Sequence, residues 1–348
     1  MRFSLVSALV AGLLSPSVAV AQATGSIDEG PFPDDLNGSN FTYQWPVKLF
    51  KFSSQLQDLE MAFMDVPPTK NHRGCSGRKC TKTAVLLHGK NFCGPTWVDT
   101  IHALTDAGYR VIAPDQIGFC KSSKPADYEY SLHQLAWNTR GLLDTLGIDK
   151  VTVIGHSMGG MIAARFGLQY PDFVDKLVSI NAIGNEDYVG KGVPYIDISV
   201  SVDQEAASNY ASIRAYQQQM YYVGQWKPEY DVWVNMSNNI YHGSQRESFV
   251  RAQARIVDMV LTQPVAPHFE ALQPQTLLMI GEKDKTAIGA QWSPPEVAEK
   301  LGHWDELGPE VLSKLPNGEL ITFPDLGHAP QISNSKEFHK KLLGWLNK

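Results

Sequence analysis

The chain has 348 residues, 43% of them hydrophobic, and a formal net charge of −6. This length and apolar content allow one large buried core with an inserted second unit. The mild negative charge, and the lack of a basic patch interleaved with aromatic residues, argue against a nucleic-acid partner.

The first 23 residues have the pattern of a secretory signal peptide. Arg2 forms a short positive region, residues 5–14 form an apolar run, and small residues around Ala21 and Ala23 offer a cleavage site. We therefore expect export, either by secretion or into a periplasm. The apolar run is too short to span a membrane, and no later stretch has 18 uninterrupted apolar residues, which argues against a membrane-spanning protein.

Residues 24–44 are rich in Gly, Pro, Asp and Asn, which predicts an extended N-terminal arm over the surface. Apolar residues then recur at about every second position in residues 47–52 and 59–66, the pattern of an antiparallel strand pair. Three glycosylation sequons would be used only in a eukaryotic host, at Asn37, Asn40 and Asn235.

Export bears on the interpretation of the four cysteines. Cys75 and Cys80 enclose a short polar loop, and an oxidising compartment favours a local disulfide there over a metal pair. No second Cys or His pair has zinc spacing, so we expect no metal site. Cys93 and Cys120 each follow a predicted strand and would meet at one sheet edge, where the sequence leaves open a disulfide or two buried thiols.

From residue 84 onward, strands and helices alternate. A helix is expected near residues 96–107, and another begins after the capping residue Ser131 and keeps its apolar spacing to residue 146. Short apolar runs predict buried strands at residues 84–87, 109–113, 151–154, 176–180, 276–280 and 320–323. This alternation is typical of an α/β protein with a mostly parallel sheet and helices on both faces.

Residues 151–160 form the most informative stretch, because they are expected to form a strand, a sharp turn and a helix. Ser157 lies on the turn, and Gly155 and Gly159 flank it in a Gly-x-Ser-x-Gly pattern. A tight strand-to-helix bend leaves no room for β-carbons at the two glycines. The pattern predicts a nucleophile elbow, which exposes the serine hydroxyl at the end of the sheet.

Between residues 184 and 267 the alternation stops, and polar helical segments dense in Tyr and Trp follow one another. The segment is too long for a connecting loop, so we predict a helical cap inserted between two parts of a core, residues 45–183 and 268–348. Since the insert leaves the sheet at the nucleophile's end, we expect it to line a mostly apolar substrate pocket. The candidate pocket residues are Tyr222, Trp226 and Trp233.

With the nucleophile elbow, a His88-Gly motif and this strand pattern, residues 45–348 resemble the α/β-hydrolase fold family. Within it, the chain is most similar to capped serine esterases and their haloperoxidase-like and methyl-esterase-like relatives. That family orders its triad as serine, acid, histidine, with the last two on loops after late strands. The resemblance implies Asp284 as the acid and His328 as the base, with Glu282 and Asp325 as competing acids.

The resemblance also implies a role for each residue. His328 would take the proton of Ser157 and return it to the leaving group, while Asp284 would orient the imidazole and stabilise its cation. The oxyanion would be bound by the backbone N–H groups of Met158 and Lys90, with Asn91 as the alternate to Lys90. No cofactor is needed for this chemistry.

Three other residues near these motifs are expected to be structural. His88 and His156 would satisfy loop backbone groups, and Asp115 would fix its own turn. A serine at position 157, where related enzymes carry an acid, also disfavours dehalogenase and epoxide hydrolase activity.

The preferred function is hydrolysis of a carboxylic ester of a small or medium organic molecule through an acyl-enzyme. Cofactor-free perhydrolase or haloperoxidase activity, lactone hydrolysis and C–C bond hydrolysis would use the same triad, and the sequence does not rank them. A catalytically silent binding module is the non-enzyme alternative, although such proteins usually lack a triad member. The oligomeric state is left open.

Overall fold

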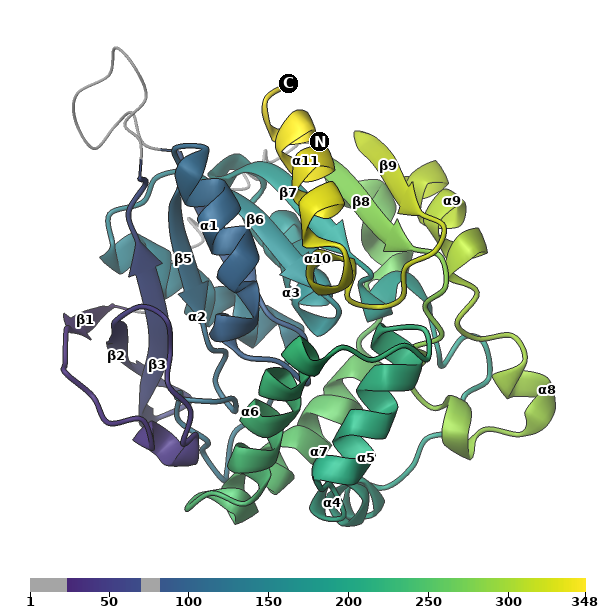
Figure 1. The fold of residues 1–348 in the computed structure, drawn as a ribbon, viewed down its shortest axis with the longest axis horizontal. Helices are drawn as coiled ribbons and strands as arrows, with labels where there is room; N and C mark the ends of the chain where they lie inside the picture. Colours follow the sequence, from purple (N-terminus) through teal and green to yellow (C-terminus); the bar gives the residue numbers. More distant parts are fainter. Residues whose placement is uncertain (1–23, 70–81) are drawn as a thin grey trace, which may run out of the picture.

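A computed structural model of the chain describes residues 24–69 and 82–348 (Figure 1). Its centre is a nine-stranded sheet with the order β1-β2-β3-β5-β4-β6-β7-β8-β9. The strands are β1 Gly25–Asp28, β2 Val47–Ser54, β3 Gln57–Val66, β4 Thr83–Leu87, β5 Arg110–Pro114, β6 Val151–His156, β7 Val174–Ile180, β8 Gln275–Gly281 and β9 Gly318–Phe323. β1, β2 and β3 pair antiparallel at one edge, and all pairings among β4 to β9 are parallel. The predicted mostly parallel sheet is confirmed.

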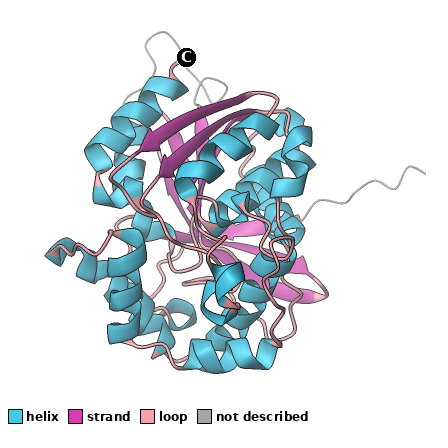
Figure 2. Ribbon diagram, turned by 90° about the vertical axis from the view of Figure 1, so that its right-hand side faces the viewer, coloured by secondary structure: helices cyan, strands magenta, loops and turns pink. Residues whose placement is uncertain are grey.

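Helices cover both faces of this sheet, which Figure 2 shows running between helical layers. The helices of the core are α1 Val98–Asp106, α2 Leu132–Thr145, α3 Met158–Gln169, α8 Pro295–Ala298, α9 Trp304–Lys314, α10 Pro330–Ser333 and α11 Ser335–Leu346. Successive side chains of a strand point to opposite faces of the sheet, so they pack into two different hydrophobic cores. In β6, Val153 packs with residues of α2 and α3, whereas Ile154 packs with residues of α1 and α11.

The predicted antiparallel strand pair and the predicted N-terminal capping residue of the second helix are both present. β2 and β3 form a hairpin in which Ser54 pairs with Gln57. The Ser131 hydroxyl accepts a hydrogen bond from the Gln134 N–H (3.0 Å) and caps α2.

The N-terminal arm differs from the expectation of an extended surface segment, because residues 25–28 form β1 and extend the sheet. Two lysines tie the following part of the arm to the core. The ammonium group of Lys121 donates to the Asp34 carbonyl, and that of Lys124 donates to the Asn37 carbonyl (2.7 Å). The arm is therefore part of the folded domain over residues 24–44.

A helical insert lies between β7 and β8, in the place predicted for the cap. Its helices are α4 Ile198–Ala206, α5 Tyr210–Tyr216, α6 Asp231–Tyr241 and α7 Arg246–Thr262, and a π-helical turn, Gln217–Tyr221, extends α5. Figure 1 shows α4 to α7 grouped together at one end of the sheet, in the lower part of the view. Hereafter these helices and the π-helical turn are called the cap.

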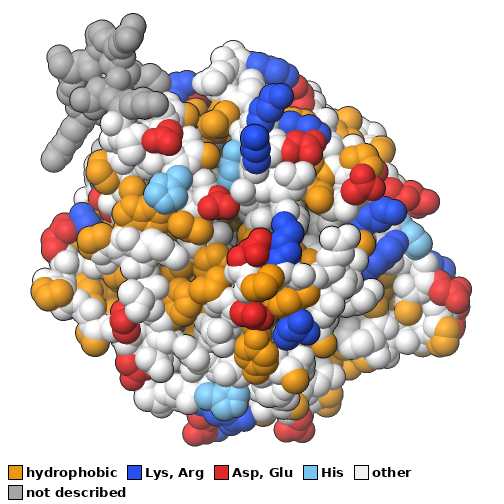
Figure 3. All heavy atoms as spheres, viewed as in Figure 1, with side chains coloured by type: hydrophobic (Ala, Val, Ile, Leu, Met, Phe, Trp, Pro, Cys, Tyr) orange, Lys and Arg blue, Asp and Glu red, His pale blue; other side chains and the backbone are white. Residues whose placement is uncertain are grey.

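The surface in Figure 3 carries acidic and basic side chains intermixed, in line with the small net charge. Among the described residues, no helix is both long enough and apolar enough to cross a membrane.

Candidate active site

Ser157 lies on a sharp turn between β6 and α3, in a backbone conformation that side-chain-bearing residues rarely adopt (φ 57°, ψ −122°). The flanking glycines are sterically required. A β-carbon on Gly159 would lie 2.0 Å from the Leu87 carbonyl oxygen, and one on Gly155 would lie 2.1 Å from the Gly159 carbonyl oxygen. The turn therefore has the geometry of a nucleophile elbow, with Ser157 at the carboxyl end of the sheet.

Asp284 and His328 are brought together from the loops after β8 and β9. The His328 Nδ1 lies 2.6 Å from the Asp284 Oδ2, and both side chains are fully buried. Two further donors hold the same carboxylate, namely the Thr286 N–H at 2.7 Å and the Asn181 side-chain amide at 2.9 Å. This carboxylate thus fixes which nitrogen of His328 carries the proton, and it leaves Nε2 as the acceptor.

The two competing acids do not contact this histidine. Glu282 is half-buried and Asp325 is exposed, and neither makes a hydrogen bond to His328 within the described residues. The structure thus places Asp284 at the position that the family motif implied.

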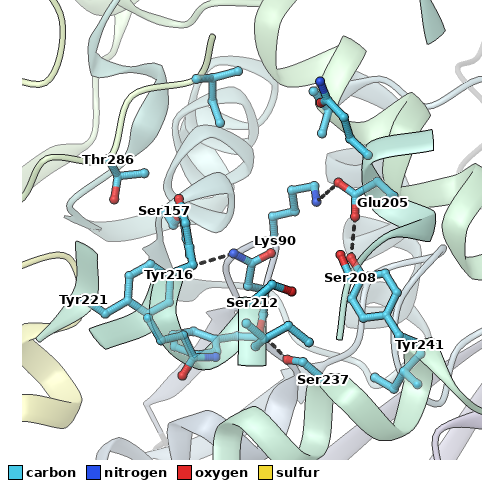
Figure 4. Close-up of a pocket in the computed structure, with 18 of the residues that line it drawn as sticks. Lys90, Ser157, Glu205, Ser208, Ser212, Tyr216, Tyr221, Ser237, Tyr241 and Thr286 are labelled. Carbon is cyan, nitrogen blue, oxygen red and sulfur yellow. Dashed lines mark hydrogen bonds and ion pairs between the residues drawn. The ribbon is translucent and has the colours of Figure 1, made fainter. Parts of the chain in front are cut away.

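Ser157 and His328 line the same pocket, which has a volume of about 410 Å³ and lies between the sheet and the cap (Figure 4). The Nε2 of His328 has no hydrogen-bond partner within residues 24–69 and 82–348. Asp284 is not among the lining residues, so it lies behind the histidine and away from the pocket. In this arrangement the histidine lies between the pocket and the acid, as a base must if it is to take a proton from the serine while the acid orients it.

The loop after β4 approaches the nucleophile closely. A β-carbon on Gly89 would lie 2.9 Å from the Ser157 Cβ, so the backbone that leads into Lys90 passes directly over the serine. The Lys90 backbone N–H makes no hydrogen bond in the described part of the chain. Met158 begins α3, where backbone N–H groups lack helical acceptors. The structure thus brings both predicted oxyanion donors beside Ser157, and their role stays a prediction.

Asn91, the alternate oxyanion residue, is held by the cap on two sides. Its side-chain amide donates to the Tyr221 hydroxyl (2.8 Å), and its carbonyl accepts from the Ser237 hydroxyl (3.1 Å). The Tyr221 ring also lies 5.0 Å from the His328 ring, centroid to centroid. Tyr221 therefore contacts both the loop after β4 and the predicted catalytic base.

The backbone of the π-helical turn packs on the loop that carries the histidine. The His328 N–H donates to the Met220 carbonyl (3.2 Å), and a β-carbon on Gly327 would lie 2.7 Å from the Tyr221 carbonyl oxygen. Gly327 is therefore needed for the close approach of cap and loop, a role that the sequence pattern did not reveal.

His88 and His156 have the structural roles expected of them. His88 donates from Nδ1 to the Gly89 carbonyl (2.9 Å) and accepts from the Gln116 N–H at Nε2 (3.0 Å). His156 donates from Nε2 to the His328 carbonyl (2.7 Å). Burial, together with the adjacent His328, holds the pKa of His156 well below its ordinary value.

Cys93 and Cys120 form a disulfide, which settles the alternative that the sequence left open. Asp115 reinforces this connection, as it accepts hydrogen bonds from the Gly94 N–H (2.8 Å) and the Lys121 N–H (3.1 Å). Asp115 and the two sulfurs lie close enough to share a metal ion, but the disulfide leaves no thiolate to bind one. The predicted bridge between Cys75 and Cys80 lies outside the described residues.

The three predicted pocket residues are not in the pocket lining. Instead they pack inside the cap. The Tyr222 ring stacks on the Tyr230 ring with a centroid separation of 3.7 Å, the Trp226 ring meets both edge-on, and Trp233 is buried in the same core. The expectation was wrong because aromatic content does not say which side of a helix faces a cavity.

The aromatic residues that do line the pocket include Tyr216, Tyr221 and Tyr241. The π-helical turn adds a residue to one turn of helix, which shifts Tyr221 and Tyr222 relative to an α-helical register. Spacing along the sequence would have placed Tyr221 on the pocket wall only if this turn had been known.

The pocket lining is mostly apolar, as expected, but one wall also carries an ion pair that the sequence analysis did not predict. The Lys90 ammonium group and the Glu205 carboxylate form an ion pair (2.7 Å), and the Tyr241 hydroxyl donates to the second oxygen of Glu205. Figure 4 shows these three side chains together on one side of the pocket, with Ser208 beside them. Apolar residues complete the lining, among them Phe92, Phe119, Ile183, Ile213, Ile240 and Phe249.

Comparison with known proteins agrees with this architecture. A family model described as the alpha/beta hydrolase fold matches residues 83–335. A crystal structure of a probable hydrolytic enzyme from Pseudomonas aeruginosa PAO1 is 48% identical, with a TM-score of 0.84, and the match covers 87% of this chain and 95% of that one.

Curated relatives are more distant or match over a shorter length. An uncharacterized protein of Mycobacterium tuberculosis is 38% identical over 34% of this chain, and the match spans only 36% of the relative's length. The 2-hydroxy-6-oxo-6-phenylhexa-2,4-dienoate hydrolase of Burkholderia cepacia is 25% identical over 76% of this chain and 87% of its own length. On the family match, the sheet and the elbow, the chain belongs to the α/β-hydrolase fold family.

Proposed function

We propose that this protein is a serine hydrolase that cleaves a carboxylic ester of a small or medium organic molecule through an acyl-enzyme. One observation carries the proposal. Within the described residues, the buried Asp284–His328 pair leaves the His328 Nε2 without a partner, in the same pocket that Ser157 lines from a strained elbow. A plain packing turn would need neither the strained serine nor a histidine with an unpaired nitrogen beside it.

The reaction follows from these positions in two halves. In the first, His328 Nε2 takes the proton of the Ser157 hydroxyl as the oxygen attacks the ester carbonyl, and the backbone N–H groups of Met158 and Lys90 stabilise the oxyanion. His328 then gives that proton to the departing alcohol, which leaves an acyl group on Ser157.

In the second half, His328 takes a proton from water as the water oxygen attacks the acyl carbon. The proton returns to Ser157, and the carboxylic acid leaves. Asp284 stays ionised and stabilises the imidazolium that forms in each half. The nucleophile, the base and the oxyanion donors are all supplied by the chain, so the proposed route contains no cofactor.

A fluorophosphonate probe tests the proposal, since it phosphonylates an activated serine. We expect intact-protein mass spectrometry to show one adduct, peptide mapping to place it on Ser157, and p-nitrophenyl esters to be hydrolysed. Ser157→Ala should lose both properties, while the matched surface variant Ser26→Ala should keep them, because Ser26 is exposed on β1. A protein that folds but neither reacts with the probe nor turns over esters would be a binding module instead.

Hydrolysis of a C–C bond is a second candidate, favoured by the likeness to the Burkholderia dienoate hydrolase. It would use the same serine and histidine on a different electrophile. The relative's own substrate and p-nitrophenyl esters should be compared in parallel by kcat/KM. A higher value for the dienoate than for every ester would assign the C–C activity.

We also propose that the protein is exported. The leader-like pattern of the first 23 residues and the disulfide between Cys93 and Cys120 support this, because disulfides persist in oxidising compartments.

A further inference from the structure

The triad does not account for every buried polar side chain in the pocket. Gln217 is fully buried and lines the pocket, yet its Nε2 and Oε1 atoms have no hydrogen-bond partner among the described residues. Native proteins pair nearly all buried polar groups, because an unpaired one lowers stability. A buried amide with no protein partner on a pocket wall indicates that its partner comes from a bound molecule.

The position of Gln217 relates it to the reacting groups. It is the first residue of the π-helical turn, and the turn ends at Tyr221, whose ring packs against His328. Ile213 and Tyr221, four residues before and after it, also line the pocket, so Gln217 lies on the pocket face of this helix. π-Helical turns are rare and occur frequently at functional sites.

The chemistry of the side chain narrows what it can bind. A glutamine amide presents an N–H donor and a carbonyl acceptor side by side, and an alkyl chain satisfies neither. A carboxylate would satisfy the donor and repel the acceptor. The charged groups on the pocket wall, Lys90 and Glu205, neutralise each other at 2.7 Å, so they add no net attraction for an ion. An uncharged secondary amide supplies both complementary groups.

We propose that Gln217 selects esters whose acyl or alcohol chain carries an uncharged amide, as in esters of N-acylamino acids or of N-acylamino alcohols. The inference rests on the proposed ester hydrolase function and names the substrate class of that same site. Gln217 is then a specificity-determining residue, distinct from the groups that carry out the reaction.

Two pairs of esters of matched chain length test this. On the acyl side, the p-nitrophenyl ester of N-acetylglycine is compared with p-nitrophenyl pentanoate, and on the alcohol side, 2-acetamidoethyl acetate is compared with pentyl acetate. In at least one pair, the wild-type ratio of kcat/KM for the amide ester over the alkyl ester should fall roughly tenfold or more in Gln217→Met. Methionine keeps the length of the side chain and removes both hydrogen-bonding groups.

Gln204→Met is the matched control. Gln204 also borders the pocket but is exposed, so solvent can hydrogen-bond to its amide without a ligand, and the ratio should stay as in the wild type. The melting temperature adds a second readout. If the Gln217 amide is unpaired in the free protein, Gln217→Met should not lower the melting temperature.

The outcomes separate this inference from the proposed function. Unchanged ratios in both ester pairs, with Ser157 still labelled and esters still hydrolysed, would overturn the role of Gln217 alone. A lower melting temperature with unchanged ratios would show that the amide is structural, and would overturn it too. Absence of both labelling and turnover in the wild type would instead refute the ester hydrolase proposal.

Discussion

Tyr221→Phe is the substitution that best tests whether the cap takes part in catalysis. The change removes one hydroxyl, which accepts from the Asn91 side chain at 2.8 Å, and keeps the ring that packs on His328. Asn91 is half-buried, so losing the acceptor should cost about 1 kcal/mol, at the lower end of the range for an unpaired buried donor. If this energy serves to hold the loop of Lys90 and Asn91 in place, kcat falls about fivefold.

The form of the loss matters as much as its size. A displaced oxyanion donor weakens the transition state and leaves ground-state binding alone, so kcat should fall while KM stays constant. The pH dependence of kcat/KM should keep its midpoint, because the Tyr221 hydroxyl pairs with Asn91 and not with an imidazole nitrogen. Steady-state kinetics on a p-nitrophenyl ester between pH 5 and pH 9, a range chosen around the ordinary histidine pKa of about 6.5, give all three quantities.

Tyr222→Phe provides the control. Tyr222 is the next residue, is equally buried, and packs inside the cap away from the pocket. Its substitution should leave kcat unchanged. A wild-type kcat in Tyr221→Phe, or an equal loss in Tyr222→Phe, would show that the contact with Asn91 does not position the loop.

Three further predictions follow from other contacts. His328→Ala should lower kcat by roughly 10³- to 10⁶-fold, and Asp284→Asn should keep a trace of activity. Circular dichroism checks that each variant is folded. Wild-type rates in either variant would show that the replaced residue is not part of the triad. Burial lowers the pKa of Lys124 to about 7, so between about pH 7 and pH 10 the unfolded chain binds one proton more than the folded chain. Over that range the free energy of unfolding, measured with urea, should rise with pH in the wild type relative to Lys124→Met. A difference between the two proteins that stays constant from about pH 7 to pH 10 would contradict this. Mass mapping of a non-reduced digest of exported protein should show Cys75 joined to Cys80 beside the bridge between Cys93 and Cys120, whereas alkylatable thiols at 75 and 80 would refute the local disulfide.

The core of the fold was predictable because its signals are local. β-Branched and apolar runs predicted every parallel strand, and a Gly-x-Ser-x-Gly pattern between a strand and a helix predicted the turn at Ser157. β1 was not predicted, because its four residues show little alternation of polar and apolar side chains. Only its pairing with β2 at the edge of the sheet distinguishes it from an irregular segment.

The parts of the site that depend on three-dimensional packing were less accessible. The family motif was enough to favour Asp284 over Glu282, but two of the three donors to its carboxylate, Asn181 and His328, come from distant segments. The pairing of Cys93 with Cys120 depended on how two loops meet at the sheet edge. The pocket position of Tyr221 depended on a π-helical turn that no residue pattern predicts.

The way the cap attaches to the core bears on how enzymes of this kind can be re-engineered. A cap that only covered the pocket could be exchanged between relatives as a module to transfer selectivity. Here the same turn supplies the Met220 carbonyl to the His328 N–H and lies against Gly327 at a distance that admits no β-carbon. A grafted cap that lacked this turn would carry its new pocket walls but leave the histidine loop without its support. Selectivity in this protein is therefore better altered by changing side chains within the existing cap than by transplanting another one.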